Sequence, residues 1–532
     1  MAIIENKKIT IILLLITVII IASFFRLWQL DKIPPGLYPD VAMNGNNALE
    51  TLRTGDFKVF YTDNNGREGM IMWLDILSFS IFGISNWSMK IVAAIFGILT
   101  VLGLYLLVKE IFKNIFPNSN KPEIIALLAS FFLATSFWHT LFSRIGFRAI
   151  LLPFILVFSF YFLFKGFRTK NFLNIILGGV FFGLGFYTYT SFRMAVLLLF
   201  ITLIGWLLIY WKEGQFKKFL LFAVCFSIFT FIIALPLGIY FLHNPQDFIS
   251  RATGVSIFAQ PNLIKAFFVS LAAHLGMFNF YGDGNWRHNY PTSPMLFWPV
   301  GIIFLIGFII SIKEIIISLK SRSWLPFTVY GSLLAWFFAL LLPGVLTYEG
   351  IPHALRVIGV IPVVYIFAAL GGYWLYNWFN KKNKIRGLLL VISIFLIFSV
   401  GYNQFYKYFF LWGENPNVKG AFTEKYAEIG YYLNSLPLET QKYVIVNEPG
   451  VPVPLLNGLP VPAQTLMFIE STKYGQPDSV YLLPENLDSI KIYKNTTIVP
   501  MKDDENLFNE LKQKFPQGII KKVDDFSVYE VE

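Results

Sequence analysis

The sequence predicts an all-α polytopic membrane protein of about eleven transmembrane helices, followed by a small α/β domain at the C-terminal end. Of its 532 residues, 56% are hydrophobic and only 14% are charged, with a mean hydropathy of +0.60. A polar surface cannot cover so much apolar material, so most of the chain must face lipid. Polar composition returns only after about residue 407.

The predicted spans begin close to the N-terminus. The first follows Lys7 and Lys8 and has no small-residue cleavage site, which indicates an uncleaved anchor. We expect spans near 9–30, 89–111, 123–140, 149–165, 171–190, 194–211, 219–242, 294–312, 325–344, 354–379 and 387–406. Two further apolar stretches, Met70–Phe82 and Pro261–Phe280, are predicted to be helices lying in the plane of the membrane surface.

Every second connection between these spans is short and basic. The basic connections lie near 109–121, 165–170, 212–218, 313–322 and 381–386. Because loops rich in Lys and Arg stay in the cytoplasm, we expect a cytoplasmic N-terminus, with outer loops 31–88 and 243–293 and the C-terminal domain outside. All the histidines then fall at or beyond the outer face: His139, His243, His274, His288 and His353. This asymmetry favours a functional site on the outer side.

Charge and cysteine content exclude several other classes. The net charge of +11 is explained by the basic loops, so no nucleic-acid partner is predicted. Cys225 is the only cysteine, which rules out a disulfide within the chain, a zinc cluster and a redox pair.

We predict two domains, a transmembrane catalytic region over 1–406 and an extracytoplasmic α/β domain over 407–532. In the second, strand-like runs occur at 442–447, 479–483 and 526–531, and helical patterns at 423–435 and 506–515. The domain contains no nucleotide-phosphate glycine loop and no recognisable catalytic motif.

The first outer loop holds the richest set of acids. Asp40, next to Pro39, is interpreted either as a general base or as the N-cap of a helix over Met43–Arg53. A carboxylate beside apolar walls binds protons more strongly, which suits a base. Asp56 and Asp63 are interpreted as turn residues, and Arg67 and Glu68 as candidate substrate ligands.

The second outer loop contains GDGNWRHNYPTSP, with Asp283, Trp286, Arg287 and His288 close together. Arg and His donate hydrogen bonds to phosphate and Trp stacks on sugar or apolar groups, so an anionic ligand with such a portion is predicted. The alternative is a rigid interfacial loop anchored by Trp286.

Further cations stand at the outer ends of the predicted spans. Any one of them is more often a snorkelling interfacial residue than a ligand, but their repetition favours some convergence on a phosphate. They are Arg144, Arg148, Arg193, His353 and Arg356.

Taken in order, these segments resemble membrane glycosyltransferases of the GT-C superfamily. The chain is most similar to glycosyltransferase family 39 and to the dolichyl-phosphate-mannose protein mannosyltransferases, over residues 10–380. The resemblance is carried by PPGLYPD, NNGREGMIMWLDILSFSIFG, SRIGFRAILLP, GFYTYTSFR, GDGNWRHNYPTSPML and PHALRVIGVIP.

The resemblance implies a GT-C-like fold, a polyprenyl-phosphate-linked sugar donor, and Asp40 as the base that activates an acceptor hydroxyl. Val41 stands where the family usually has a second acid, and Gly69 where proline is common. The first departure leaves the role of the second acid empty or transfers it to Glu68. The WWD-type motif of oligosaccharyltransferases is absent, which argues against that branch.

We therefore expect an inverting glycosyl transfer on the outer membrane face, mannosyltransferase-like, with the acceptor being a protein, a lipid or a glycan. The outer arginines and histidines would stabilise the leaving phosphate, and the prenyl tail would lie in a groove among the helices in contact with membrane lipid. No metal is then required, although the sequence leaves open a divalent metal bound by Asp40 and Asp283.

Three other classes remain as alternatives. A lipid-linked glycan polymerase or ligase would have a similar outer site, with large late loops. A secondary transporter would show intramembrane ionisable residues and repeated halves, and neither is apparent. A non-catalytic membrane scaffold would use its C-terminal domain to bind partners.

Overall fold

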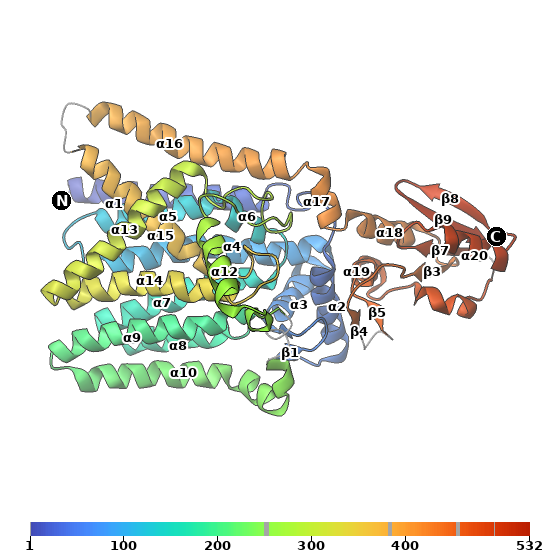
Figure 1. Ribbon diagram of the computed structural model, residues 1–532, viewed down its shortest axis with the longest axis horizontal. Helices are drawn as coiled ribbons and strands as arrows, with labels where there is room; N and C mark the ends of the chain where they lie inside the picture. The colour runs from blue at the N-terminus through green and yellow to red at the C-terminus, as the bar shows by residue number, and fades with distance from the viewer. Residues whose placement is uncertain (1, 249–254, 381–385, 454–457, 494, 532) are drawn as a thin grey trace. The chain divides into compact units, whose positions relative to one another are not determined.

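The computed structural model describes residues 2–248, 255–380, 386–453, 458–493 and 495–531 (Figure 1). Its contacts divide the chain into two compact units. The membrane unit comprises Met1–Trp28 and Ala93–Glu414, and the α/β unit comprises Gln29–Val92 and Asn415–Glu532. The units therefore group the chain differently from a boundary at residue 406, because the first predicted outer loop is packed with the C-terminal segment.

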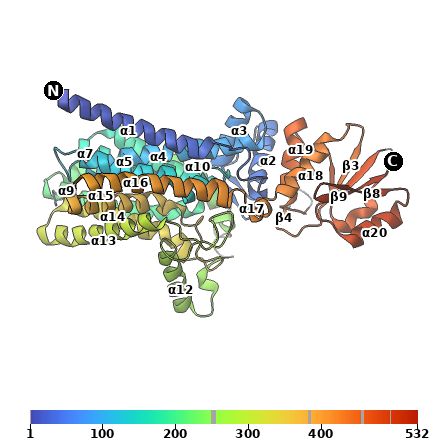
Figure 2. The ribbon, with the colours of Figure 1, turned by 90° about the horizontal axis from the view of Figure 1, so that it is seen from above.

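The membrane unit is a bundle of long, roughly parallel helices (Figures 1 and 2). Within the described ranges, nine helical segments are long and apolar enough to cross a membrane. They are built from α1 (Ala2–Leu27), α4 (Asn86–Phe112), α7 (Leu151–Thr169), α9 (Ala195–Lys212), α10 (Phe216–His243), α13 (Trp298–Ser321), α14 (Trp324–Val345), α15 (Ile361–Asn380) and α16 (Arg386–Tyr406). The predicted class of polytopic α-helical membrane protein is confirmed.

The other two predicted spans are shorter helices. For the span near 123–140, α5 (Lys121–Thr135) ends where Ser136 turns extended, and the Ser136 side chain accepts a hydrogen bond from the His139 backbone N–H to cap α6 (Phe137–Phe142). For the span near 171–190, α8 (Phe172–Gly185) has 14 residues. The remaining helical pieces are η1 (Arg148–Ile150), η2 (Thr190–Met194), η3 (Ile257–Ala259), α12 (Leu263–Gly276), η4 (Ile358–Val360) and η6 (Lys407–Trp412).

Glycines let α13 and α15 approach closely. A Cβ added at Gly307 would overlap the carbonyl oxygen of Phe367, and one at Gly371 would overlap that of Ile303. In lipid, helices associate through such close backbone packing rather than through the hydrophobic effect. The crossing therefore depends on both glycines.

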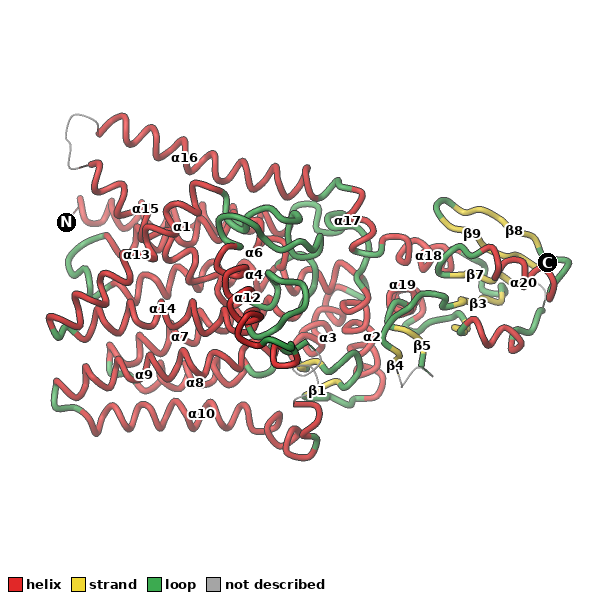
Figure 3. The backbone as a smooth tube through the Cα atoms, in the orientation of Figure 1, coloured by secondary structure: helices red, strands yellow, loops and turns green. Residues whose placement is uncertain are grey.

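The C-terminal part of the α/β unit is built around a five-stranded sheet in the order β6-β3-β7-β9-β8 (Figure 3). Strand β3 (Gln441–Ile445) pairs in parallel with β6 (Val480–Leu482) and β7 (Thr496–Pro500), whereas β9 (Phe526–Val531) is antiparallel to β7 and β8 (Ile519–Val523). Alternate residues enter two cores: Val444 and Val499 face one, and Tyr443 and Ile498 the other. The predicted α/β character of this segment is confirmed.

Helices cover both faces of this sheet. Helices α18 (Glu424–Ser435) and α19 (Ala463–Tyr474) contribute to the first core, and α20 (Glu505–Lys514) to the second. Smaller elements complete the segment: α17 (Pro416–Ala421), β4 (Pro452–Val453), β5 (Leu459–Pro460) and η8 (Pro484–Ser489).

The N-terminal part of the α/β unit comprises α2 (Pro39–Thr54), a small hairpin and α3 (Met70–Phe82). Strands β1 (Phe60–Tyr61) and β2 (Arg67–Glu68) are antiparallel, and Asn64 and Asn65 between them adopt positive φ, as the predicted Asn-Asn-Gly turn requires. Helix α3 has the bounds predicted for an in-plane helix. The chain before α2 packs so closely on the C-terminal part of the unit that only glycine fits at position 36, because a Cβ there would overlap the Phe422 carbonyl oxygen.

Candidate active site

Asp40 lies in the first turn of α2. Pro39 takes the first helical position, where its missing N–H costs nothing, and Tyr38 is the N-cap residue. The alternative interpretation of Asp40 as the N-cap residue is therefore wrong, because Tyr38 holds that position. Its carboxylate is half-buried and accepts a hydrogen bond at Oδ1 from Asn64 Nδ2 at 2.8 Å. The other carboxylate oxygen receives no hydrogen bond from a described residue, so Asp40 can accept a proton.

Arg67 fixes the hairpin against α2. Its guanidinium is 1% exposed and donates from Nη1 to Asn44 Oδ1 at 2.7 Å and from Nη2 to Asn47 Oδ1 at 2.6 Å. The bound asparagines are one helical turn apart, so the planar fork matches both. Arg67, which was predicted to bind substrate, therefore holds the turn that carries Asn64. Glu68 is buried beside it, 3% exposed.

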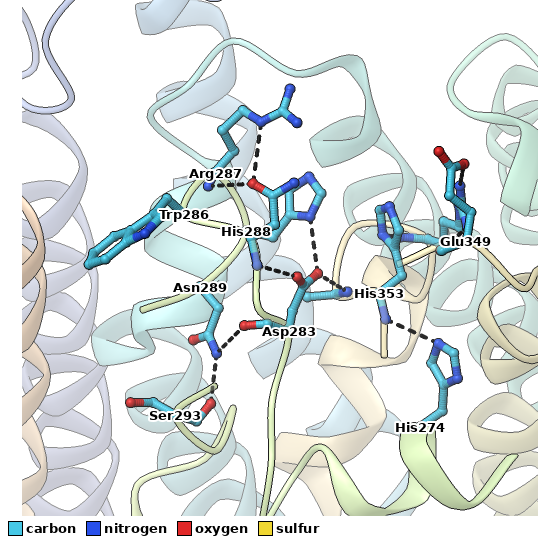
Figure 4. Close-up of polar contacts among 12 residues, drawn as sticks. His274, Asp283, Trp286, Arg287, His288, Asn289, Ser293, Glu349 and His353 are labelled. Atoms are coloured by element: carbon cyan, nitrogen blue, oxygen red, sulfur yellow. Dashed lines mark hydrogen bonds and ion pairs between the residues drawn. The ribbon is translucent and has the colours of Figure 1, made fainter. Parts of the chain in front are cut away.

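In the membrane unit, Asp283 organises a buried polar cluster (Figure 4). Its Oδ1 accepts the Asn285 backbone N–H at 2.8 Å, and its Oδ2 accepts that of Ala354 at 2.7 Å and pairs with His288 Nδ1 at 3.0 Å. Asp283 and His288 are 2% and 4% exposed. The loop after α12 is thereby joined to the segment before η4.

Two further histidines extend this cluster. The His353 backbone N–H donates to His274 Nε2 at 3.2 Å, and His274 Nδ1 lies 2.8 Å from the Ser270 carbonyl oxygen. His274 therefore carries its proton on Nδ1, because Nε2 is an acceptor. Burial is the main cause that lowers the pKa of both imidazoles, His353 well below its usual value, with nearby His288 adding to the effect there. Both shifts favour the neutral imidazole, which can offer a hydrogen bond but no charge.

Arg356 and Arg287 border the same cluster. Arg356 donates to Thr347 Oγ1 at 2.9 Å and forms an ion pair with Glu349 at 3.0 Å. The Glu349 carboxylate is 69% exposed, so this pair can be exchanged for another anion at little cost. Arg287 Nε donates to Asn285 Oδ1 at 3.3 Å. The Trp286 backbone carbonyl accepts a hydrogen bond from Trp412 Nε1 at 2.9 Å, which ties this loop to η6.

The other predicted arginines are bound elsewhere in the membrane unit. Arg144 is fully buried, donates to the carbonyls of Phe25 and Trp28 and lies against two aromatic rings, so it holds the end of α1. Arg148 lies over the Tyr189 ring, and Arg193 over the Phe248 ring at 4.0 Å. The structure thus brings Asp283, His288, His353, Arg287 and Arg356 together, while the contacts given above for these three arginines are with other residues.

Sequence reasoning missed several members of the site. His274 was noted only for its place at the outer face, and Asn64 only as a turn residue. The contact between His274 and His353 joins residues 79 positions apart, so no local pattern could reveal it. The ligand atoms of Asp283, His288 and His353 lie within 4.8 Å of one another, so this trio could hold a metal ion. The sequence leaves open a metal bound by Asp40 and Asp283 instead.

An apolar groove of about 600 Å³ lies beside the cluster. Helices α9, α12 and α14 line it with Leu197, Phe200, Leu271, Leu275, Phe338, Val345 and neighbouring residues. Leu275 and Val345 directly follow His274 and Gly344, and a Cβ at Gly344 would contact the His274 imidazole. One end of the groove therefore adjoins the buried polar cluster.

This arrangement defines a multi-pass membrane protein with the GT-C fold. Residues 69–240, less than half of the chain, match the family model described as dolichyl-phosphate-mannose-protein mannosyltransferase. The predicted resemblance to these membrane glycosyltransferases is confirmed. No curated protein sequence matches the chain.

Two solved structures share the fold. ArnT from Cupriavidus metallidurans, bound to undecaprenyl phosphate, is 13% identical with a TM-score of 0.56, over 98% of this chain and 97% of that one. The oligosaccharyltransferase AglB from Archaeoglobus fulgidus, in complex with an inhibitory peptide and a dolichol-phosphate, is 14% identical with a TM-score of 0.51. That match covers 89% of this chain and 65% of AglB, so this chain spans slightly less than two thirds of the archaeal enzyme.

Proposed function

We propose that this protein is a glycosyltransferase that moves a sugar from a polyprenyl-phosphate carrier to an acceptor hydroxyl on the outer face of a membrane. The observation that carries the proposal is the apolar groove whose end adjoins the cluster around Asp283 and His274. A polyprenyl phosphate has the same division into a long apolar chain and a polar head. The lipids bound to ArnT and AglB have this chemistry and support the proposal.

In the proposed reaction, the acceptor oxygen attacks the anomeric carbon opposite the carrier phosphate. A new glycosidic C–O bond forms, the bond from the anomeric carbon to the phosphate oxygen breaks, and the configuration inverts. Asp40 takes the proton of the acceptor hydroxyl, and the carrier leaves as polyprenyl phosphate. Asn64 holds one oxygen of Asp40, which orients the other towards the acceptor.

The leaving phosphate gains negative charge as the bond breaks. We propose that Arg356, released from exposed Glu349, and Arg287 stabilise that charge, with His288 and His353 as further hydrogen-bond donors. These groups supply the positive charge that a metal would otherwise provide, so we propose that transfer requires no metal. Mannose is the first sugar to test, because of the family match.

The test is transfer by the purified full-length protein. It is incubated with undecaprenyl phosphate carrying radiolabelled mannose, and with the carriers of glucose and N-acetylglucosamine, in the presence of a membrane extract as a source of acceptors. The expected result is acceptor-dependent release of undecaprenyl phosphate, unaffected by EDTA. Failure to release it from any of the carriers would contradict the proposal.

Lipid binding gives a second test that does not depend on the sugar. Undecaprenyl phosphate binding is measured by native mass spectrometry for the wild type, Arg356→Gln and Arg322→Gln. Because a hydrogen bond to a charged group contributes about 1.5–3 kcal/mol, Arg356→Gln is expected to weaken binding by at least about tenfold. Arg322→Gln removes an exposed arginine of a predicted cytoplasmic loop and should have no effect. Equal binding by all three proteins would remove Arg356 from the carrier site.

A further inference from the structure

A cavity of about 350 Å³, lined by both polar and apolar side chains, lies within the α/β unit, between α2 and α19. Positions 43, 46, 47, 50 and 53 of α2 line it and form one helical face, as do positions 464, 467 and 471 of α19. Asp63 of the hairpin turn forms a third wall. The volume lies within the usual range for small-molecule sites.

Asp63 has an unusual environment. It is 8% exposed and lines the cavity, yet its carboxylate has no hydrogen bond or ion pair with any described residue. The Asp63 oxygens are not among the side-chain atoms that are both inaccessible and unpaired, so the carboxylate is open to the cavity. A ligand in the cavity can therefore donate hydrogen bonds to it.

The neighbouring groups alternate between donors and acceptors. Asn47 gives its oxygen to Arg67, which leaves its amide NH₂ as a donor. Gln464 accepts from the amide of Asn46 at 2.8 Å through Oε1, and its own NH₂ has only a weak contact at 3.9 Å with a methionine sulfur. Glu50 adds an acceptor. Met43, Val453 and Met467 supply apolar surface between these groups.

This combination matches a carbohydrate. Each sugar hydroxyl both donates and accepts a hydrogen bond, and the C–H faces of the ring need apolar contact. Two carboxylates, Asp63 and Glu50, against the single cation Arg53 disfavour a phosphate or another anion. A peptide would be recognised mainly through backbone groups along a strand edge or a long groove, whereas side chains of two helices line this compact cavity.

We propose that this cavity binds the sugar hydroxyls of a glycan acceptor. The inference rests on the proposed function and specifies its acceptor. Asn64, whose amide holds Asp40, follows Asp63 directly in the hairpin turn, so one turn contacts both the base and the cavity. An acceptor held there presents its reacting hydroxyl to Asp40, the base that removes the proton.

Binding is tested on the full-length protein in detergent by saturation-transfer NMR. The probes are the methyl glycosides of mannose, glucose, galactose and N-acetylglucosamine, and a blocked Ser/Thr peptide. We expect saturation transfer to at least one glycoside and not to the peptide. The signal should fall at least fivefold in Asp63→Asn and in Glu50→Gln. It should persist in Asp56→Asn, which removes an exposed carboxylate of the same unit.

Thermal unfolding of each variant shows whether it is folded, and Glu50→Gln at a partly exposed position retains the test if Asp63→Asn is unstable. Binding of the peptide alone, of no glycoside, or of glycosides equally to all variants would overturn the inference. The bound glycoside then serves as acceptor in the transfer assay, where both cavity variants should raise the KM for acceptor and leave that for donor unchanged. A raised KM for donor instead would place the donor sugar in the cavity and overturn the inference.

The two proposals can fail separately. Glycoside binding that depends on Asp63, without transfer from any carrier, would leave the cavity assignment standing and contradict the glycosyltransferase. Sugar transfer with the same KM for acceptor in the wild type and in both cavity variants would support the glycosyltransferase and contradict the cavity assignment.

Discussion

The polar cluster of the membrane unit and the acids of the α/β unit differ in how their polar atoms are satisfied. Asp283 accepts two backbone N–H groups and pairs with a histidine, and His274 and His353 are held by each other. In the α/β unit, Asp40 has one side-chain donor and Asp63 has none among the described residues. The contacts of Asp283 thus fix the geometry of its cluster, whereas Asp40 and Asp63 keep carboxylate oxygens that a ligand can bind.

The largest effect is expected for Asp40→Asn. The amide cannot take the acceptor proton, so the transfer rate should fall by about 10²–10⁴-fold, the usual contribution of a general base. Undecaprenyl phosphate binding should not change, because the carrier does not need this group. The assay measures release of undecaprenyl phosphate, with the exposed Asp31→Asn as matched control. Full turnover by Asp40→Asn would assign the base to another residue.

The contrast between the two regions is tested directly by comparing Asp283→Ala with Asp63→Asn. The first leaves the buried N–H of Ala354 and the His288 ring without their acceptor, which should cost about 1–3 kcal/mol of unfolding free energy. The second removes a carboxylate that has no partner among the described residues, so the unfolding free energy should stay about the same. Thermal unfolding in detergent measures both. Similar losses in the two variants would refute the distinction between framework and ligand-binding groups.

A third prediction concerns the apolar groove. A Cβ added at Gly331 in α14 meets no atom within 4 Å, so Gly331→Leu should place its side chain in the groove without disturbing the helix. We expect undecaprenyl phosphate to bind several-fold more weakly. Gly238→Leu is the matched control, because Gly238 also has open space but lies on α10, away from the groove. If both variants bind the lipid as the wild type does, the prenyl chain lies elsewhere.

The smallest effect is expected at Asp75 in α3. Burial raises the pKa of this carboxyl well above its ordinary value, and no residue in the described ranges donates a hydrogen bond to its Oδ1. The folded protein thus holds a proton that the unfolded chain releases near pH 3.9, and this contribution to stability is lost as pH rises through the folded pKa. Asp75→Asn should therefore match the wild type near pH 4 and be more stable at pH 7. Parallel pH profiles of the two melting temperatures would contradict this.

The sequence predicts the elements whose pattern is local. The run Met70–Phe82 became α3 with the predicted bounds, and the predicted strands near 442–447 and 526–531 correspond to β3 and β9. Strand β7 was not predicted, because its short run is buried at every position and lacks the alternation of apolar and polar residues that marks a strand with one exposed face. Span length failed at α5, where Ser136 supplies a cap that an apolar count does not detect.

For the candidate site, the sequence reveals which residue types are available but not which neighbours satisfy them. The turn at Asp63 was predicted correctly, yet its place in a cavity depends on α19, some 400 positions along the chain. Arg67 and Arg144 look like anion ligands in sequence, and only the structure shows their guanidiniums bound to asparagine and backbone oxygens. The chemistry of a cation is local, whereas its availability depends on tertiary packing.

The short helix α8 also has a consequence for the surrounding bilayer. Fourteen residues rise roughly 21 Å, about 9 Å less than the ~30 Å thickness of a typical hydrocarbon core. The bilayer next to α8 should therefore become thinner, with the lipid headgroups drawn inward towards η2, which carries Arg193. A carrier lipid would then have a shorter distance to lift its phosphate out of the membrane on this side of the protein than elsewhere.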